Sequence, residues 1–200
     1  MLLVAIISLA SCTAGEGVGT QSPNQQRLAS TRAGAWKPMK VSGIRSCRVL
    51  RQAVHSAPRQ DAHGVGSVRL PCLTRGPSVD VSRLRDRPVL VNLWASWCGP
   101  CREEMPILQA AYERYGDRID FVGVDTRDAA PHAAAFLRAM RVTYPELADT
   151  EGELLNQLRI PGLPVTLVLD SDGAVLDKHI GAFEGSDLED LLSRVVSSSP

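Results

Sequence analysis

The arrangement of apolar and polar residues divides this chain into an irregular first third and a regular remainder. Four segments of the regular part are rich in apolar residues and are bounded by turn residues. The first segment, residues 89–94, is an almost continuous apolar run, which is typical of a strand in a sheet covered on both faces. The expected strands are residues 89–94, 119–124, 165–169 and 175–180, with a short edge strand at 68–70 and a hairpin turn at Ser171-Asp172-Gly173.

Apolar residues at helical spacing separate these strands. One such series follows Pro100 and consists of Met105, Leu108, Ala111, Tyr112 and Tyr115, with Pro106 expected to kink the helix. Further helices are expected at 129–140, 151–158 and 186–196, the last capped by Ser186, with one helical turn at 81–84. This order of elements predicts an α/β sandwich in which a central mixed sheet is flanked by helices.

Residues 13–66 show no sustained period and are rich in Gly, Ser, Gln, Pro and Arg. A segment of this composition is expected to form a flexible tether. The 200 residues suffice for one domain of roughly 130 to 150 residues with an extension. The predicted organisation is therefore a signal peptide at 1–12, a tether at 13–66 and a domain at 67–200.

The formal net charge of zero conceals two parts of opposite sign. Residues 13–87 hold 13 Lys and Arg against 4 Asp and Glu, a balance of +9, whereas residues 88–200 hold 9 against 18, a balance of −9. A basic stretch can bind nucleic acid, but only Trp36 is aromatic in the tether and no binding fold accompanies it. A solvated linker that is attracted to anionic lipid headgroups is favoured, and no nucleic-acid partner is expected.

Cys98 and Cys101 are the candidate reactive groups, because the run Trp97-Cys98-Gly99-Pro100-Cys101 joins an expected strand to an expected helix. Unpaired N–H groups and the helix dipole at a helix N-terminus lower a thiol pKa from about 8.5 toward neutrality. Cys98 is therefore expected to attack a disulfide, and Cys101 to resolve the mixed disulfide. Pro100 suits the first turn, where its missing N–H leaves no hydrogen bond unmade.

Two simpler interpretations compete with a redox dithiol. A structural zinc site needs a second pair of ligands, but Cys12, Cys47 and Cys72 are widely scattered and no two histidines lie within five residues. A pair of inert core thiols is disfavoured, since Gly-Pro between them is poor core material and good helix-start chemistry. No metal and no other cofactor are expected.

The apolar run at residues 2–10 has the length of a signal-peptide core and is too short to span about 30 Å of hydrocarbon. It leads into Leu9-Ala10-Ser11-Cys12, which resembles the bacterial lipobox, where cleavage leaves a lipid-carrying Cys at the new N-terminus. No Lys or Arg precedes the run, so either the true start lies upstream or the chain is secreted after a small-residue cleavage site. Both interpretations predict an extracytoplasmic protein, on the outer face of the bacterial membrane if Cys12 is lipidated.

Cys47 and Cys72 remain outside the Cys-x-x-Cys pair. In an exported chain, two leftover cysteines form a structural disulfide more often than they stay free. Closing their loop of about 26 residues contributes about 3 kcal/mol by chain entropy. We therefore expect a Cys47–Cys72 disulfide that pins the end of the tether to the domain.

Several motifs together resemble the TlpA/ResA-like extracytoplasmic branch of the thioredoxin superfamily. They are residues 91–98 (VNLWASWC), residues 101–106 (CREEMP) and residues 162–166 (GLPVT). The resemblance covers about residues 67–197 and is highly specific when the motifs are taken together. It implies a thioredoxin-like fold and a thiol-disulfide oxidoreductase.

The resemblance also implies that Pro164 is the family's cis-proline, which faces the dithiol across the active site. A cis X-Pro bond turns the preceding backbone, so that the N–H and C=O of Leu163 can pair with an extended substrate. Trp97, Gly99 and Pro100 are expected to contribute to the same substrate-binding surface. An ordinary trans-proline that opens a strand is the alternative.

By the same resemblance, Glu104 is the acid–base group that serves Cys101. Asn92 stands where cytosolic thioredoxins hold a buried Asp, and an amide cannot exchange a proton at neutral pH. Glu104 follows Cys101 by three residues, on the same helix face, and partial burial beside two sulfurs should raise its pKa. The alternative is that Glu103 and Glu104 only decorate a first turn that favours carboxylates.

These residues predict a protein thiol-disulfide oxidoreductase that acts on exported proteins as a reductant. The resemblance implies clients such as apocytochrome c and electrons from a membrane thiol transporter. Gly-Pro between the cysteines favours the reducing side only modestly, so an exported oxidant and a non-catalytic thioredoxin-like binding module stay open as alternatives. Peroxidase activity is disfavoured, because no separate low-pKa cysteine motif is present.

Overall fold

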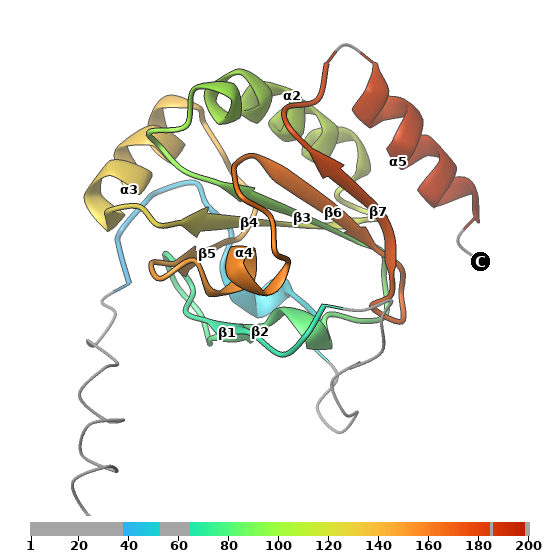
Figure 1. Ribbon diagram of the computed structural model, residues 1–200, viewed down its shortest axis with the longest axis horizontal. Coiled ribbons are helices and arrows are strands. Elements are labelled where there is room, and N and C mark those ends of the chain that lie inside the picture. The colour runs from blue at the N-terminus through green and yellow to red at the C-terminus, as the bar shows by residue number, and fades with distance from the viewer. Residues whose placement is uncertain (1–37, 53–64, 185, 199–200) are drawn as a thin grey trace, which may run out of the picture. The chain divides into compact units, whose positions relative to one another are not determined.

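A five-stranded mixed sheet forms the centre of the domain (Figure 1). The computed structural model describes residues 38–52, 65–184 and 186–198. The strand order is β5-β4-β3-β6-β7, with parallel pairing from β3 to β5 and antiparallel pairing from β3 through β6 to β7. The strands are β3 (Val89–Trp94), β4 (Asp120–Thr126), β5 (Glu146–Asp149), β6 (Val165–Leu169) and β7 (Val175–Ile180).

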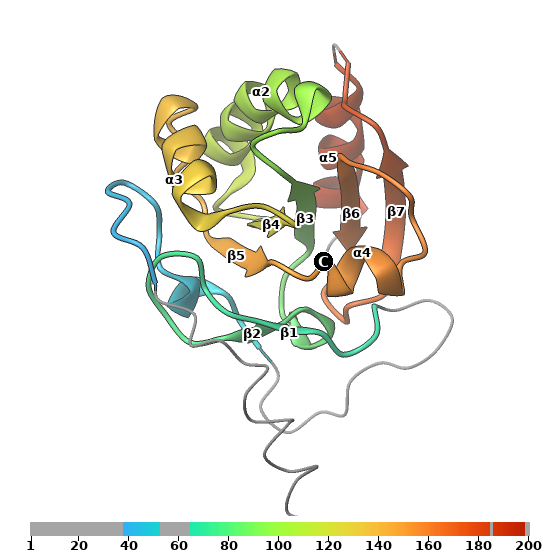
Figure 2. The ribbon, with the colours of Figure 1, turned by 60° about the vertical axis from the view of Figure 1, so that its left-hand side comes forward.

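Helices cover one face of this sheet, and short elements cover the other (Figures 1 and 2). The covering helices are α2 (Gly99–Tyr115), α3 (Ala130–Ala139) and α5 (Asp187–Ser198). The other face carries β1 (Arg69–Leu70), β2 (Val79–Asp80), the 3-10 turns η1 (Cys47–Val49) and η2 (Val81–Arg83), and α4 (Glu153–Gln157). This layered α/β arrangement confirms the fold class that the sequence predicts.

Alternate residues of β3 face two different interiors, as the pleat of a strand requires. Val91 and Leu93 belong to the apolar core beneath β1, β2 and α4. Asn92 and Trp94 point to the helix-covered face, where the Trp94 ring lies 5.0 Å from that of Phe136 in α3. All of β3 is buried, which explains why its sequence is almost continuously apolar.

The apolar pattern predicts β3, β6 and β7 with the bounds that the structure shows, but it does not predict β5. The sequence of β5 is Glu146-Leu147-Ala148-Asp149, and carboxylates are uncommon in strands. All four residues are nevertheless buried, and the strand pairs in parallel with β4 at the sheet edge. Tertiary pairing therefore overrides local propensity in β5.

Residues 38–52 lie against the domain, although the sequence places them in a flexible tether. The N–H of Cys47 donates to the carbonyl of Arg75 at 3.0 Å, and the N–H of Met39 donates to the carbonyl of Leu73 at 2.9 Å. Cys47 and Leu50 are buried in the apolar core. The prediction of a flexible tether is thus wrong for this segment, because a few apolar side chains and backbone hydrogen bonds outweigh its polar composition.

The other parts of the expected tether, residues 13–37 and 53–64, lie outside the described residues. The same holds for the expected signal peptide and for Cys12. The domain boundary at residue 67 stays a prediction. Among the residues that the structure describes, no helix has the length and apolar character needed to cross a bilayer.

A disulfide between Cys47 and Cys72 joins the N-terminal segment to the domain. Both sulfurs belong to the apolar core on the face opposite α2. Cys72 forms an isolated antiparallel bridge with Leu147 of β5, and the N–H of Leu73 donates to the carbonyl of Glu146 at 2.8 Å. The cross-link therefore ends directly on the edge strand of the central sheet.

Removing this cross-link should lower the free energy of unfolding by about 3 kcal/mol through loop-closure entropy. The comparison is made in a background where Cys98 and Cys101 are both Ser, so that only one disulfide changes. Urea unfolding of this background, with and without Cys47→Ala and Cys72→Ala, measures the difference. Equal unfolding midpoints and slopes for the two proteins would show that the cross-link contributes no stability.

Candidate active site

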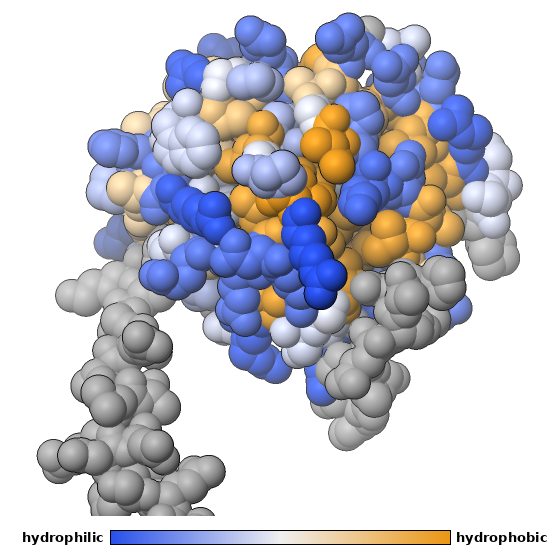
Figure 3. Space-filling model, in the orientation of Figure 1, coloured by the Kyte–Doolittle hydropathy of each residue, from blue (hydrophilic) through white to orange (hydrophobic). Residues whose placement is uncertain are grey.

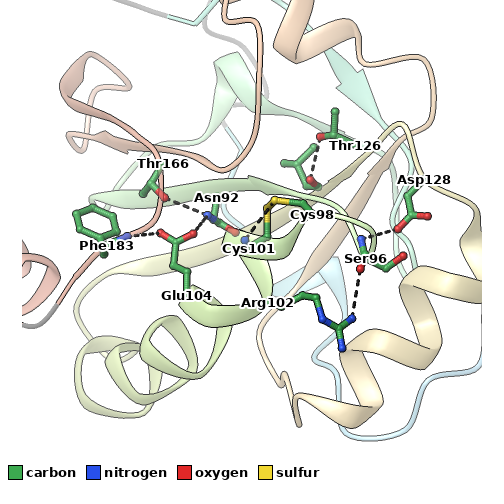
Figure 4. Close-up of a disulfide and its surroundings, with 11 residues drawn as sticks. Asn92, Ser96, Cys98, Cys101, Arg102, Glu104, Thr126, Asp128, Thr166 and Phe183 are labelled. Atoms are coloured by element: carbon green, nitrogen blue, oxygen red, sulfur yellow. Dashed lines mark hydrogen bonds between the residues drawn. A yellow bond between two sulfur atoms is a disulfide. The ribbon is translucent and has the colours of Figure 1, made fainter.

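A disulfide joins Cys98 to Cys101 at the N-terminus of α2 (Figure 4). Cys98 is the N-cap residue, and its Sγ accepts a hydrogen bond from the N–H of Cys101 at 3.2 Å. Pro100 lies in the first turn of the helix. A sulfur in this position is stabilised as a thiolate by a backbone donor and by the positive end of the helix dipole.

The loop that carries Cys98 is tied to the loop that follows β4. The N–H of Ser96 donates to a carboxylate oxygen of Asp128 at 2.7 Å, and the indole N–H of Trp97 donates to the carbonyl of Arg127 at 3.2 Å. The Ser96 carbonyl accepts from the guanidinium of Arg102 at 3.3 Å. Side-chain and backbone contacts from two other segments therefore fix the approach to α2 (Figure 4).

The two sulfurs differ in access. Cys98 is 5% exposed and Cys101 is 1% exposed, while the side chain of Trp97 is 62% exposed. A Cβ at Gly99 would meet no atom within 4 Å, so open space lies over this part of the helix start. Cys98 is thus the sulfur that a visiting polypeptide would meet first.

On the face that Figure 3 shows, apolar residues lie among hydrophilic ones. Large apolar side chains with substantial exposure are few among the described residues: Val49, Trp97, Leu176 and Ile180. Trp97 is the member of this group that adjoins a reactive sulfur. It therefore provides an apolar contact beside Cys98.

The peptide bond between Leu163 and Pro164 is cis. The next residue, Val165, pairs with Leu93 in the adjacent strand β3. Pro164 therefore lies at the end of the sheet from which the loop to Cys98 departs. The structure places the expected substrate-binding residues, including the half-buried Leu163, at the same end of the sheet as the dithiol.

Glu104 is buried one helical turn beyond Cys101. Its Oε2 accepts a hydrogen bond from Nδ2 of Asn92 at 3.3 Å, and its Oε1 accepts one from the N–H of Phe183 at 3.4 Å. Burial raises the pKa of Glu104 to about 7, and these hydrogen bonds offset only part of the effect. A carboxyl with this pKa can hold or release a proton near neutral pH.

Asn92 connects Glu104 to the sheet and lies on the disulfide side of the carboxylate (Figure 4). Its Nδ2 also donates to the hydroxyl of Thr166 at 3.0 Å. Its Oδ1 is buried and accepts no hydrogen bond within the described residues. This oxygen is an acceptor available to a neighbouring thiol, because a buried carbonyl favours gaining a hydrogen bond.

The sequence does not single out Asp125 and Glu146, two further buried carboxyl groups near this site. Oε2 of Glu146 accepts from the indole N–H of Trp94 at 2.9 Å. Burial raises the pKa of Asp125 to about 8 and that of Glu146 well above its usual range. The one available signal was the acidic residue at position 125, directly after the expected apolar strand at 119–124.

Other candidate residues lie apart from this site. Cys47 and Cys72 belong to the opposite core, and Cys12 lies outside the described residues. Within residues 38–52, 65–184 and 186–198, no group of three or more His, Cys, Asp or Glu side chains is arranged to hold a metal ion. The dithiol, Glu104 and the cis-proline are therefore the groups that the structure brings to one end of the sheet.

Comparison with known proteins finds one kind of relative, namely thioredoxin-like proteins and thiol-disulfide oxidoreductases. The Redoxin family matches residues 61–192. Thioredoxin-like protein YneN of Bacillus subtilis is 30% identical over 120 residues, which are 58% of this chain and 70% of YneN. Thiol-disulfide oxidoreductase ResA of Bacillus cereus is 25% identical over 121 residues, which are 60% of this chain and 70% of ResA.

A solved structure extends this likeness to three dimensions. The crystal structure of a putative thiol:disulfide interchange protein DsbE from Chlorobium tepidum superimposes with a TM-score of 0.60 at 26% identity. The match covers 68% of this chain and 94% of that protein. The thioredoxin-like fold expected from the sequence is therefore confirmed.

The raised pKa of Glu104 predicts how stability depends on pH. The folded state holds this proton up to about pH 7, whereas the unfolded chain releases it near pH 4.5. The stabilisation is therefore complete below about pH 4.5 and is lost as the pH rises through about 7, by on the order of 3 kcal/mol. Glu104→Gln should lack this loss.

Urea unfolding of the oxidised protein and of Glu104→Gln across that pH range measures the effect. The difference in unfolding free energy between the two proteins should change in favour of the variant as the pH rises. Parallel curves would contradict the assignment, because a titrating group confined to one protein must change their difference. Other buried acids contribute equally to both proteins and cancel in the comparison.

Proposed function

The chain belongs to the Redoxin family and is a ResA/TlpA-like thiol-disulfide oxidoreductase of the thioredoxin superfamily, and from this premise we propose that Cys98 and Cys101 reduce disulfides in exported proteins. One observation carries the proposal: the more accessible sulfur, Cys98, caps α2 and accepts the Cys101 N–H. This arrangement favours the thiolate, which is the attacking species in exchange.

In the first step, the Cys98 thiolate attacks one sulfur of a client disulfide. A new bond forms between Cys98 Sγ and that sulfur, the client disulfide breaks, and the second client sulfur leaves as a thiolate. The exposed Trp97 and the open space at Gly99 and Pro100 give the client room to approach. The backbone of Leu163, before cis-Pro164, is positioned to pair with an extended client segment.

In the second step, Cys101 loses its proton to Glu104 and its thiolate attacks Cys98 Sγ. The mixed disulfide breaks, the Cys98–Cys101 disulfide forms, and the remaining client sulfur leaves as a thiolate. The two client thiolates take up two protons, so the client gains two electrons and two protons in all. Glu104 suits this role because its pKa of about 7 allows both proton states at neutral pH.

Asn92 supports the same proton transfer. Its amide N–H contacts Glu104, and its free Oδ1 can accept a hydrogen bond from the reduced Cys101 thiol. The amide thereby keeps the Glu104 carboxyl and the Cys101 thiol in position for proton transfer and carries no proton itself. Return of the enzyme to the dithiol requires two electrons from another thiol pair, which we assign to a membrane thiol transporter.

The expected clients are exported proteins that need reduced cysteines, such as apocytochrome c. The relatives named ResA and DsbE are thiol-disulfide oxidoreductases or interchange proteins, which supports protein disulfides as the substrate class. The signal-peptide pattern at residues 1–12 and the lipobox-like Cys12 support an extracytoplasmic location. The basic segment upstream of the domain would then serve as the link to the membrane surface.

The two sulfurs should separate in a trapping experiment. Cys101→Ser keeps the attacking thiolate but cannot resolve the intermediate, so it should accumulate a covalent complex with a disulfide-containing protein such as insulin. Cys98→Ser should form no such complex and should lose insulin reduction by at least about 100-fold. Non-reducing gel electrophoresis and an insulin turbidity assay provide the measurements.

A complex that forms equally with Cys98→Ser would overturn the assigned order of attack. Unchanged insulin reduction with both sulfurs replaced would instead support a binding module whose dithiol is incidental. The direction is decided by equilibrating the dithiol with glutathione. A potential of about −270 mV supports a reductant, whereas one of about −120 mV identifies an oxidant.

Lipidation at Cys12 is tested in bacteria that express the full chain. Growth with labelled palmitate should label the wild-type protein in the membrane fraction, and Cys12→Ser should carry no label and appear in the soluble extracytoplasmic fraction. Cys47→Ser serves as the matched control and should keep the label. An unlabelled wild type would refute the anchor and leave secretion as the mode of export.

A further inference from the structure

Asp125 is a buried carboxyl without an ordinary role in the fold. It is 1% exposed, and neither of its oxygens accepts a hydrogen bond within the described residues. The carboxylate of Asp128 lies within hydrogen-bonding reach of it. A buried, ionised carboxylate with no donor is very unfavourable, so this group is expected to keep its proton.

Asp128 has the opposite surroundings. One of its oxygens accepts the Ser96 N–H at 2.7 Å, and the other accepts the Ala129 N–H at 2.7 Å. Short bonds from two backbone donors suit an ionised carboxylate. We therefore assign the proton between the two carboxyls to Asp125, whose O–H donates to Asp128. Asp128 in turn accepts the N–H of Ser96 in the loop before Cys98.

Glu146 fills the space beside Asp125 on the same face of the sheet. Its Oε2 receives the Trp94 indole N–H, and its Oε1 is buried with no partner within the described residues. A Cβ at Gly123 would lie 2.1 Å from Oε2 of Glu146, so the absence of a side chain there makes room for the carboxyl. The missing side chain at Gly123 therefore leaves room for the buried carboxyl of Glu146 on this face.

We propose that Asp125 is a positioning residue for the dithiol: its protonated carboxyl holds Asp128 in place, and Asp128 holds Ser96 and the loop that carries Cys98. The inference rests on the proposed role of Cys98 in thiol-disulfide exchange. Loss of the Asp125 proton puts two carboxylates side by side in a buried site, and their repulsion weakens the contact of Asp128 with Ser96. The loop is then released from the end of β4.

The charged groups around Asp125 support retention of its proton. From β5, the charges of Glu146 and Asp149 act on it, although the Asp149 carboxylate accepts the N–H groups of Glu153 and Leu154 at the start of α4. The pKa values of both carboxyls are themselves raised. From β3 it faces Trp94, which is uncharged. From its own loop it faces Asp128, and the nearby Arg127 acts on Asp149. From α2, the guanidinium of Arg102 lies over the Phe136 ring of α3, 5.4 Å from its centroid, and reaches the Ser96 carbonyl.

These neighbours set the pH range over which Asp125 loses its proton. Burial first, then the carboxylates of Asp128 and Asp149, raise the pKa of Asp125 to about 8. The loop is therefore held through neutral pH and loosened in mild alkali. Glu104 titrates near pH 7 and contacts Asn92 rather than this pair, so the two acids act on different parts of the site.

The Ser96 amide resonance reports the proposed contact directly. In the oxidised protein, the 15N–1H signal of Ser96 should shift between about pH 6 and about pH 10 with a midpoint near the Asp125 pKa of about 8. Asp125→Asn keeps a donor for Asp128 but cannot ionise, so its Ser96 signal should not move over this range. Glu104→Gln is the matched control and should keep the wild-type midpoint.

The wild-type titration alone can overturn the inference, even if a variant fails to fold. A Ser96 signal that is constant over this range, or one that titrates equally in Asp125→Asn, would contradict it. Because the measurement uses the oxidised, non-exchanging protein, it does not depend on activity. Failure of Cys101→Ser to trap a client would refute the proposed function and leave the Ser96 result standing.

A second measurement links the contact to chemistry. Alkylation of Cys98 in the reduced protein accelerates with pH in any variant as the thiolate forms. The ratio of the wild-type rate to the Asp125→Asn rate should be constant below about pH 7 and should change by about twofold or more above about pH 8. A ratio that is constant throughout would show that the loop contact does not influence the attacking sulfur.

Discussion

The hydrogen bond from the Cys101 N–H to Cys98 Sγ is the contact on which the rest of this site depends. It requires that a helix begin at the sulfur itself, and hence that a fully buried strand, β3, deliver the chain to that point. The sheet supplies the rigid base, and α2 supplies the N–H groups. The reactive sulfur is consequently placed by the main-chain geometry at the start of α2, and the Asp128 side chain holds the loop before it.

The helix-covered face combines apolar packing with an unusual number of buried acids. Trp94 and Phe136 pack as rings, while Glu104, Asp125 and Glu146 lie among them with little or no exposure. Buried carboxyls destabilise a fold unless they are neutral or hydrogen-bonded. Each of these three carboxyls either accepts an N–H or has a raised pKa. This face therefore holds carboxyl protons close to the dithiol without carrying a large net charge.

The sequence was informative wherever one local pattern decided the structure. The apolar run of β3 predicted a central strand, the Cys-x-x-Cys pair predicted the start of α2, and the order of strands and helices predicted the layered fold. The Gly-Leu-Pro motif, through its resemblance to the family, predicted the cis bond before Pro164. Prediction failed where distant contacts decided. β5 contains Glu146 and Asp149 and is buried because β4 pairs with it on one side and residues 71–73 bond to it on the other, and residues 38–52 are ordered by contacts with the domain.

The Cys47–Cys72 disulfide has a mechanical consequence for a chain that begins well before the domain. A pull applied upstream of Cys47 passes through a covalent bond into the edge of the sheet beside β5. The pull therefore does not break the noncovalent contacts of η1 one after another. Such tension therefore enters the fold at the margin of the sheet, where Cys72 bridges to Leu147, and the start of α2 lies on a different element.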